Sequence, residues 1–170
     1  MSFQAYASVK GSKQGQFKGE STKPDREDWM EVIAFTMGVV SPHDPATGQI
    51  TGRRQLDPVT FVKQWGSASP QGLVACSTNE VLSTSTFEFV QTDALGEELV
   101  YQTVKLTNAT ISRILRGTGD PGEVLGSGSI PSGTETRAVE RWTFIFSEIE
   151  VVDQAGNTIY SDGRSHRTTV

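Results

Sequence analysis

A period of two runs through residues 29–40, which are Trp-Met-Glu-Val-Ile-Ala-Phe-Thr-Met-Gly-Val-Val. Alternation of this kind is typical of a β-strand, because successive side chains point to opposite faces. Bulky side chains fall on one face and small or polar ones on the other: Ile33, Phe35, Met37 and Val39 against Ala34, Thr36 and Gly38. The stretch therefore predicts one strand that covers a core on one side only.

Further strands are predicted along the chain on the same grounds, and long polar or Gly/Pro-rich loops separate them. A turn with Asp93 and Gly96 predicts a hairpin, and residues 153–157 predict another turn. The predicted strands span 3–9, 59–64, 86–90, 99–106, 109–115, 142–151 and 158–160, and the long loops span 11–28, 41–52 and 117–136. This succession indicates a mainly β protein, a closed or nearly closed barrel.

One short helix is predicted to begin at Ser69-Pro70. Serine can accept a hydrogen bond from an orphan backbone N–H at the N-cap, and proline suits the first helical position. Asn79 is the expected stop. Cys76, in the middle of this helix, is interpreted as a small buried hydrophobe.

The composition of the chain excludes several classes of function. The chain has 170 residues, a formal net charge of -5, 35% hydrophobic residues and one cysteine. One domain is expected, with no nucleic-acid partner, since that would need a basic face. No apolar run approaches the length of a membrane span, and the N-terminal residues do not resemble a signal peptide, so we expect synthesis in the cytoplasm and export, if any, by a dedicated machine.

No catalytic or cofactor motif emerges. Gly117-Thr118-Gly119-Asp120-Pro121-Gly122 matches the spacing of a dinucleotide loop, but Pro121 and further glycines leave no helix to receive a pyrophosphate, so a flexible loop is favoured. His43 and His166 have no partner at metal-ligand spacing. We expect no enzyme, no cofactor and no metal.

Four stretches, in order, carry a resemblance to a known family. They are Gly19-Glu20-Ser21, residues 29–38, residues 52–71 with their Ser-Pro helix start, and residues 142–149 with alternating aromatic residues. Together they resemble the Hcp family, the haemolysin-coregulated tube proteins of type VI secretion. The match spans about residues 3 to 152. This chain departs from many members after Lys63, where Gln64-Trp65 follows.

The resemblance implies a small β-barrel of two packed antiparallel sheets with one short α-helix on the side. We expect this domain to cover residues 1–160, with a polar tail over 161–170. The family implies six-subunit rings that stack into a hollow tube, a contracting sheath that propels the tube out with a spike-tip protein, and effector proteins carried or chaperoned in the lumen. It also implies export to the extracellular space or a target cell, without membrane insertion.

Candidate assembly residues follow from the strand alternation and the loops. Ala34 and Thr36, on the small or polar face, are the candidates for facing the lumen. The proline-anchored loop 41–52 is the candidate for ring stacking or subunit contact, because prolines lower the entropy lost on docking. Its candidate residues are Pro42, His43, Asp44 and Pro45, with Arg53 and Arg54 at its end.

Alternatives remain open. A phage-type tail tube protein shares the same architecture and serves another contractile injection machine. A non-catalytic β-barrel binding module would need an exposed aromatic residue outside the core pattern, and Trp65 is the candidate.

Overall fold

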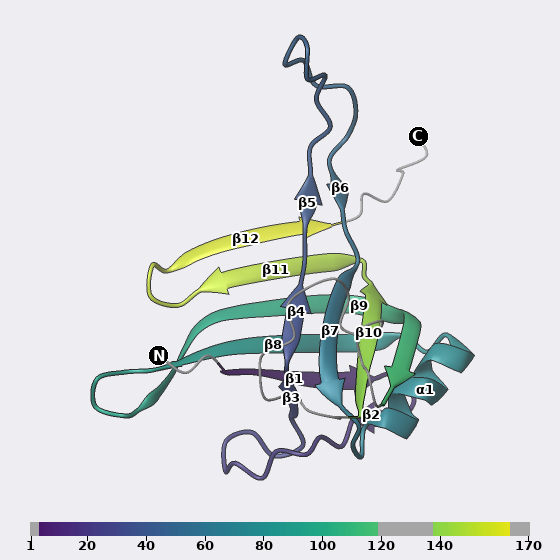
Figure 1. The fold of residues 1–170 in the computed structure, drawn as a ribbon, viewed down its shortest axis with the longest axis vertical. Coiled ribbons are helices and arrows are strands. Elements are labelled where there is room, and N and C mark those ends of the chain that lie inside the picture. The colour runs from purple at the N-terminus through teal and green to yellow at the C-terminus, as the bar shows by residue number, and fades with distance from the viewer. Residues whose placement is uncertain (1–3, 119–137, 164–170) are drawn as a thin grey trace.

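A computed structural model describes residues 4–118 and 138–163, which form an antiparallel β protein with one helix (Figure 1). The helix is α1 (Ser69–Thr78). The strands are β1 (Gln4–Gly11), β2 (Gly15–Gln16), β3 (Met30–Val32), β4 (Ala34–Thr36), β5 (Val39–Val40), β6 (Gln55–Leu56), β7 (Val59–Gln64), β8 (Leu82–Thr92), β9 (Glu98–Gly117), β10 (Val139–Ile145), β11 (Glu148–Asp153) and β12 (Thr158–Gly163). The mainly β fold with one short helix that the sequence predicts is confirmed.

The segment 30–36 joins the two ends of the main sheet. Hydrogen-bonded neighbours run from β1 through β8, β9 and β10 to β7. β3 pairs with β1, and β4 pairs with β7. Between them, the Ile33 N–H donates to the Val62 carbonyl at 2.8 Å. The circuit of pairings encloses the core, as expected of a barrel.

The single strand predicted over 29–40 is therefore wrong in its extent. The segment forms three short strands, because it changes partner twice: β3 pairs with β1, β4 with β7, and β5 with β6. Val39, predicted on the bulky core face, is 45% exposed, since β5 has already left the barrel. The alternation holds within β4, where Phe35 contacts the core and its two neighbours are exposed.

One long strand, β9, serves both parts of the sheet. Its first half pairs with β8 and β11, and its second half pairs with β10. The change falls at Asn108, which has a left-handed backbone (φ 48°), a conformation that asparagine tolerates better than most residues. The two strands predicted at 99–106 and 109–115 are thus one bent strand.

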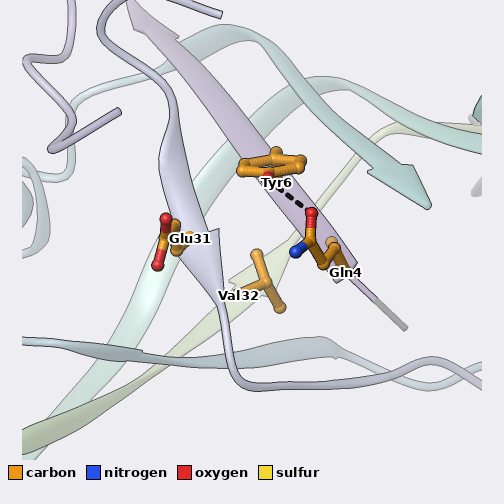
Figure 2. Close-up of a pocket in the computed structure, with 5 residues that line it drawn as sticks. Gln4, Tyr6, Glu31 and Val32 are labelled. Atoms are coloured by element: carbon orange, nitrogen blue, oxygen red, sulfur yellow. Dashed lines mark hydrogen bonds between the residues drawn. The ribbon is translucent and has the colours of Figure 1, made fainter. Parts of the chain in front are cut away.

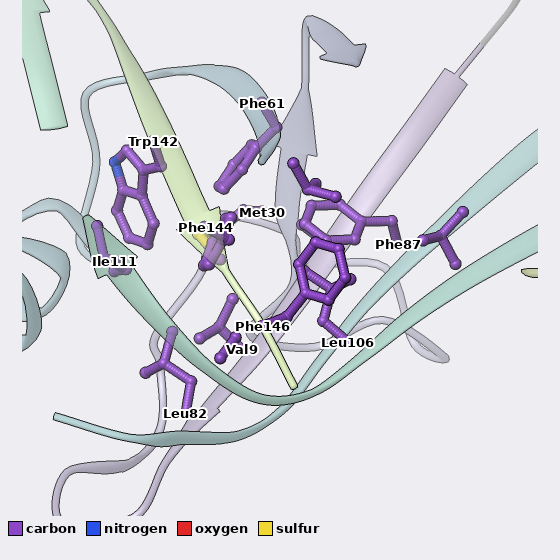
Figure 3. Close-up of a cluster of buried hydrophobic side chains, with 14 of the residues drawn as sticks. Val9, Met30, Phe61, Leu82, Phe87, Leu106, Ile111, Trp142, Phe144 and Phe146 are labelled. Carbon is purple, nitrogen blue, oxygen red and sulfur yellow. The ribbon is translucent and has the colours of Figure 1, made fainter. Parts of the chain in front are cut away.

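Aromatic side chains fill the barrel (Figure 3). Phe61 stacks on Phe144 with ring centroids 5.6 Å apart and meets Phe87 edge-on at 5.4 Å. Trp142 lies 5.3 Å from Phe61, and all four side chains are fully buried. Each such side chain contributes about 1.5–3 kcal/mol of burial free energy, and aromatic pairs add about 0.5–1.5 kcal/mol.

Helix α1 packs on the Trp142 end of this core. Its N-cap is Ala68, not Ser69, because the Ser69 hydroxyl is engaged by the Gly66 N–H and by Glu140. The helix ends at Asn79 as predicted, in a left-handed C-cap (φ 53°). A Cβ on Gly72 would lie 2.4 Å from the Trp142 ring, so only glycine lets the helix approach this closely.

A two-stranded arm leaves the barrel between β4 and β7. Strands β5 and β6 pair antiparallel and carry the loop 41–54 away from the body of the protein (Figure 1). A β-bridge between His43 and Ile50 continues the pairing into the loop, where the sequence predicts no regular element. The loop is therefore an ordered extension of the fold.

The turn at 92–97 is confirmed, with the Asp93 carboxylate accepting the Leu95 and Glu97 N–H groups. The turn at 153–157 is also confirmed, and β12 continues to Gly163, three residues into the predicted tail. Most of the predicted loop 117–136 and the tail position His166 lie outside the described residues.

Candidate functional site

The candidates Ala34 and Thr36 are exposed and lie on the outer face of the sheet. This outer face is formed by β4, β7, β10 and the second half of β9, and it lies opposite the aromatic core because side chains alternate along each strand. Strand register aligns its residues in two rows, Thr36–Thr60–Thr143–Arg113 and Ala34–Val62–Arg141–Leu115. The structure thus joins the two predicted residues to six that the sequence analysis did not select.

The outer face is shallow. Two hollows of about 180 and 160 Å³ lie along it, and Thr60 and Arg141 contribute to both. The hydroxyls of Thr36 and Thr60 hydrogen-bond to each other across β4 and β7. Both hollows are smaller than the roughly 300–1,000 Å³ of a typical small-molecule pocket, so the face offers no deep site for a small molecule.

The arm holds the other predicted candidates, Pro42, His43, Asp44, Pro45, Arg53 and Arg54. Asp44 organises its tip, since its carboxylate accepts the Ala46 N–H at 2.9 Å and the Thr47 hydroxyl at 3.0 Å. These hydrogen bonds hold the pKa of Asp44 below its usual value. The His43 ring nitrogen Nδ1 lies 2.7 Å from the Ser41 carbonyl oxygen.

Arg54 links the base of the arm to strand β12. Its guanidinium donates from two nitrogens to the Asp162 carboxylate, a bidentate geometry that favours strong pairing. The Tyr160 hydroxyl donates to the same carboxylate at 3.0 Å. The hydrogen bonds from Arg54 are the main reason that the pKa of Asp162 falls well below its usual range. The sequence marked Arg54 as a charged candidate but did not indicate this partner, which is 108 residues away.

A buried ionic network lies beneath the helix start. Lys63 and Glu140 are fully buried, and Lys63 Nζ lies 2.9 Å from Glu20 Oε1 and 3.5 Å from Glu140 Oε1. The Ser69 hydroxyl donates to Glu140 at 2.7 Å, and Arg116 Nε donates to it at 2.8 Å. The network connects the Gly-Glu-Ser stretch, the strand before the helix, the helix start and the closing strand. Two of the four stretches that carry the family resemblance, residues 19–21 and 52–71, therefore meet at this network, beside a strand that continues into a third.

A further hollow lies beside β1 and β3, and Figure 2 shows the residues that line it. The Tyr6 hydroxyl donates to Gln4 Oε1 at 2.9 Å and accepts from Lys23 Nζ at 2.6 Å. Arg26 lies 4.8 Å from the Tyr6 ring centroid and pairs with Glu88. Neighbours within the chain thus engage Tyr6, Lys23 and Arg26 beside this hollow.

Trp65, the candidate for a binding module, is engaged within the chain. Its indole N–H donates to the Val139 carbonyl at 3.0 Å, and the Arg116 guanidinium lies 4.2 Å from the ring centroid. The side chain is 39% exposed, but its only donor is used and one ring face is covered.

The described residues contain no group of three or more His, Cys, Asp or Glu side chains placed to hold a metal ion. Within the same residues no helix has the length and apolar character needed to cross a bilayer.

These features define the class of the protein: an antiparallel β-barrel with a side helix, a projecting arm and a broad outer face. The family described as type VI secretion system effector, Hcp, matches residues 6–152. The chain belongs to this family.

Known proteins agree with the assignment. The major exported protein of Pseudomonas aeruginosa PAO1 is 33% identical over 134 residues, which cover 72% of this chain and 78% of that protein. The Hcp1 protein of E. coli EAEC 042 superposes with a TM-score of 0.80 at 25% identity, covering 95% of this chain and 99% of the other. The secreted protein Hcp3 of Pseudomonas aeruginosa superposes with a TM-score of 0.73 at 23% identity, covering 96% and 100%, and supports the fold.

Proposed function

We propose that this protein is a structural tube protein of a type VI secretion system. Six copies form a ring, rings stack into a hollow tube, and sheath contraction propels the tube, capped by its spike-tip protein, out of the cell. Effector proteins travel in the lumen. The protein acts without catalysis and without a cofactor, and its destination is the extracellular space or a target cell.

Family membership is the observation that carries this proposal. The match covers nearly the whole barrel, from residue 6 to residue 152. A relative is named for its export, and a structural neighbour is described as secreted. By analogy with these two proteins, we infer that this chain is exported as well.

The outer face supports the lumen assignment. Ala34 and Thr36 are exposed there, and the rows that contain them run across four strands. A face of this breadth, without a deep pocket, suits loose contact with a protein cargo and its later release. We assign this face to the lumen, with Ala34 and Thr36 among its lining residues.

The arm supports the stacking assignment. It carries exposed apolar side chains on both of its edges, with Val39 45%, Val40 46% and Ile50 73% exposed. A head-to-tail interface between identical subunits closes into a ring when its rotation divides a full circle, and stacking needs a second contact surface. We assign that second surface to the arm, including Pro42, His43, Asp44, Pro45 and Arg53, with Arg54 holding its base.

The phage-type tail tube is the second candidate, because the same barrel, face and arm would serve it. The genes beside this one distinguish the two, since a type VI tube is encoded with its sheath and spike-tip proteins. The binding-module alternative is less favoured, because Arg116 covers the Trp65 ring and the indole N–H is already bonded.

Negative-stain electron microscopy of the concentrated protein tests the proposal. We expect annuli with an open centre and short stacks of them. Ile50→Lys places a charge on the arm and should abolish the stacks while leaving single annuli. Leu95→Lys is the matched control, because Leu95 is 86% exposed at the tip of another hairpin. A field of separate small particles, with no annuli, would contradict the proposal.

A further inference from the structure

Two arginines on the outer face share one hollow. Arg113 on β9 and Arg141 on β10 lie in neighbouring rows of the face, with Thr143 opposite Arg113 and Leu115 opposite Arg141. Both line the hollow of about 160 Å³, together with Thr60, Leu115 and Thr143. Their guanidinium groups are therefore presented on the same patch of surface.

Within the described parts of the chain, neither arginine has a carboxylate partner. Arg26, Arg54 and Arg116, by contrast, each pair with an Asp or Glu. The outward positions of β4, β7, β10 and the second half of β9 include no acidic residue. The patch is thus a local excess of positive charge on a chain whose formal net charge is -5.

Guanidinium groups are suited to one class of ligand. Each presents five N–H donors in a planar fork that matches a carboxylate with two parallel hydrogen bonds. The neighbouring threonine, alanine and valine side chains are short, so an extended segment can approach the forks without obstruction.

We propose that Arg113 and Arg141 form a docking site for acidic segments of cargo proteins, with Asp and Glu carboxylates seated on the two guanidinium forks. This inference rests on the proposed function, because the ligand is cargo only if this face lines the lumen.

Weak individual contacts suit such a role. An exposed ion pair contributes little, because water screens it on both sides, so one subunit alone would hold an acidic segment loosely. Repetition of the site around a ring raises the effective affinity without any new kind of contact. The cargo would be retained collectively and released when the assembly separates.

The test measures fluorescence anisotropy of a labelled oligoglutamate peptide with the full-length protein. The Arg113→Gln, Arg141→Gln double variant should bind about tenfold more weakly, since it removes both of the exposed ion pairs that hold the peptide. The matched control is Lys10→Gln, Lys105→Gln, which removes two exposed positive charges from other strands. It should bind as tightly as the unaltered protein, and a neutral Gly/Ser peptide should not bind.

A second variant tests the site even if the Gln double variant does not fold. Arg113→Lys, Arg141→Lys keeps both charges but loses the planar forks, so binding should weaken several-fold while its salt dependence remains. Equal binding by this variant and the unaltered protein would overturn the carboxylate-fork assignment.

Light scattering on the same samples distinguishes a failure of the docking site from a failure of the tube proposal. A ring that does not bind oligoglutamate, or that binds it equally well in the Gln double variant, overturns the docking site and leaves the tube proposal intact. A monomer that binds through the two arginines overturns the ring and, with it, the cargo assignment, and leaves only a carboxylate-binding site on this face. A ring that falls apart in the Gln double variant overturns the site in another way, since the arginines would then contact a second copy of the chain.

Discussion

Lys63 and Glu140 are cross-strand neighbours on β7 and β10, and both side chains are completely buried, with Nζ 3.5 Å from Oε1. Glu140 also accepts hydrogen bonds from Ser69 and Arg116, and Lys63 keeps a second partner in Glu20. Removing the Glu140 charge leaves the buried lysine only partly compensated, at a cost of up to about 3–5 kcal/mol. Glu140→Gln should therefore lower the free energy of unfolding by that amount, measured by urea denaturation. The exposed Glu150→Gln change should stay within about 0.5 kcal/mol of the unaltered protein.

The double variant Lys63→Met, Glu140→Leu tests whether the cost comes from the unpaired charge. Replacing both members of a buried ion pair with apolar residues is often neutral or stabilising. We expect the double variant to recover much of the stability that Glu140→Gln loses. A double variant less stable than the single one would show that the network contributes through more than charge compensation.

Gly72→Ala should destabilise the protein through a steric clash. The added Cβ would lie 2.4 Å from the Trp142 ring, and Trp142 is fully buried among aromatic neighbours. Overpacking of this kind costs about 1–3 kcal/mol. Val74→Ala, at a helix position that is 48% exposed, is the control and should cost little. Thermal unfolding followed by circular dichroism compares the two, and equal melting temperatures would refute the close helix contact.

Asp162→Asn should loosen the arm without unfolding the barrel. The change weakens the bidentate pair with Arg54, whose side chain is 58% exposed, so the global stability should change by no more than about 1 kcal/mol. Amide hydrogen exchange in residues 39–56 should accelerate, because this pair ties the arm to β12. Asp57→Asn is the control on an exposed carboxylate near the arm. Unchanged exchange in Asp162→Asn would show that the arm is held by other contacts.

Glu80 should make the stability depend on pH. Burial raises the pKa of this carboxyl, but hydrogen bonds from the Gln14 side chain and from the N–H groups of Gln14 and Lys13 outweigh burial, so the pKa is lowered. A carboxyl with a lowered folded-state pKa stabilises the fold above its unfolded-state pKa, and this stabilisation is lost as the pH falls through the folded-state pKa.

The unaltered protein should therefore lose stability as the pH falls below about 4.5, and Glu80→Gln should show a smaller loss over the same interval. At neutral pH the variant should be less stable by about 1–3 kcal/mol, since it weakens three hydrogen bonds to Lys13 and Gln14. Urea denaturation at a series of pH values measures both effects. Parallel stability curves for the two proteins would contradict this assignment.

Local sequence patterns predicted the strands well where a strand keeps the same neighbouring strand along its whole length. The alternation placed Phe35 toward the core and Ala34 and Thr36 on the exposed face, and the turn residues located both hairpins. The family resemblance indicated the barrel with its side helix.

The errors arose where tertiary partners decide the outcome. Periodicity cannot show that residues 30–40 change neighbours twice, nor that β9 continues through Asn108. A serine before a proline predicts an N-cap, but here the Ser69 hydroxyl bonds Glu140, a residue 71 positions away. The pairs Arg54–Asp162 and Lys63–Glu140 join distant positions in the same way, so no local signal could have indicated them.

In light scattering coupled to size exclusion at low and high salt, a six-membered ring of the untagged protein would appear as a discrete particle of about six subunits, each of 18.4 kDa, because closed rotational symmetry fixes the stoichiometry. A clean monomer at high protein concentration would contradict the tube assignment.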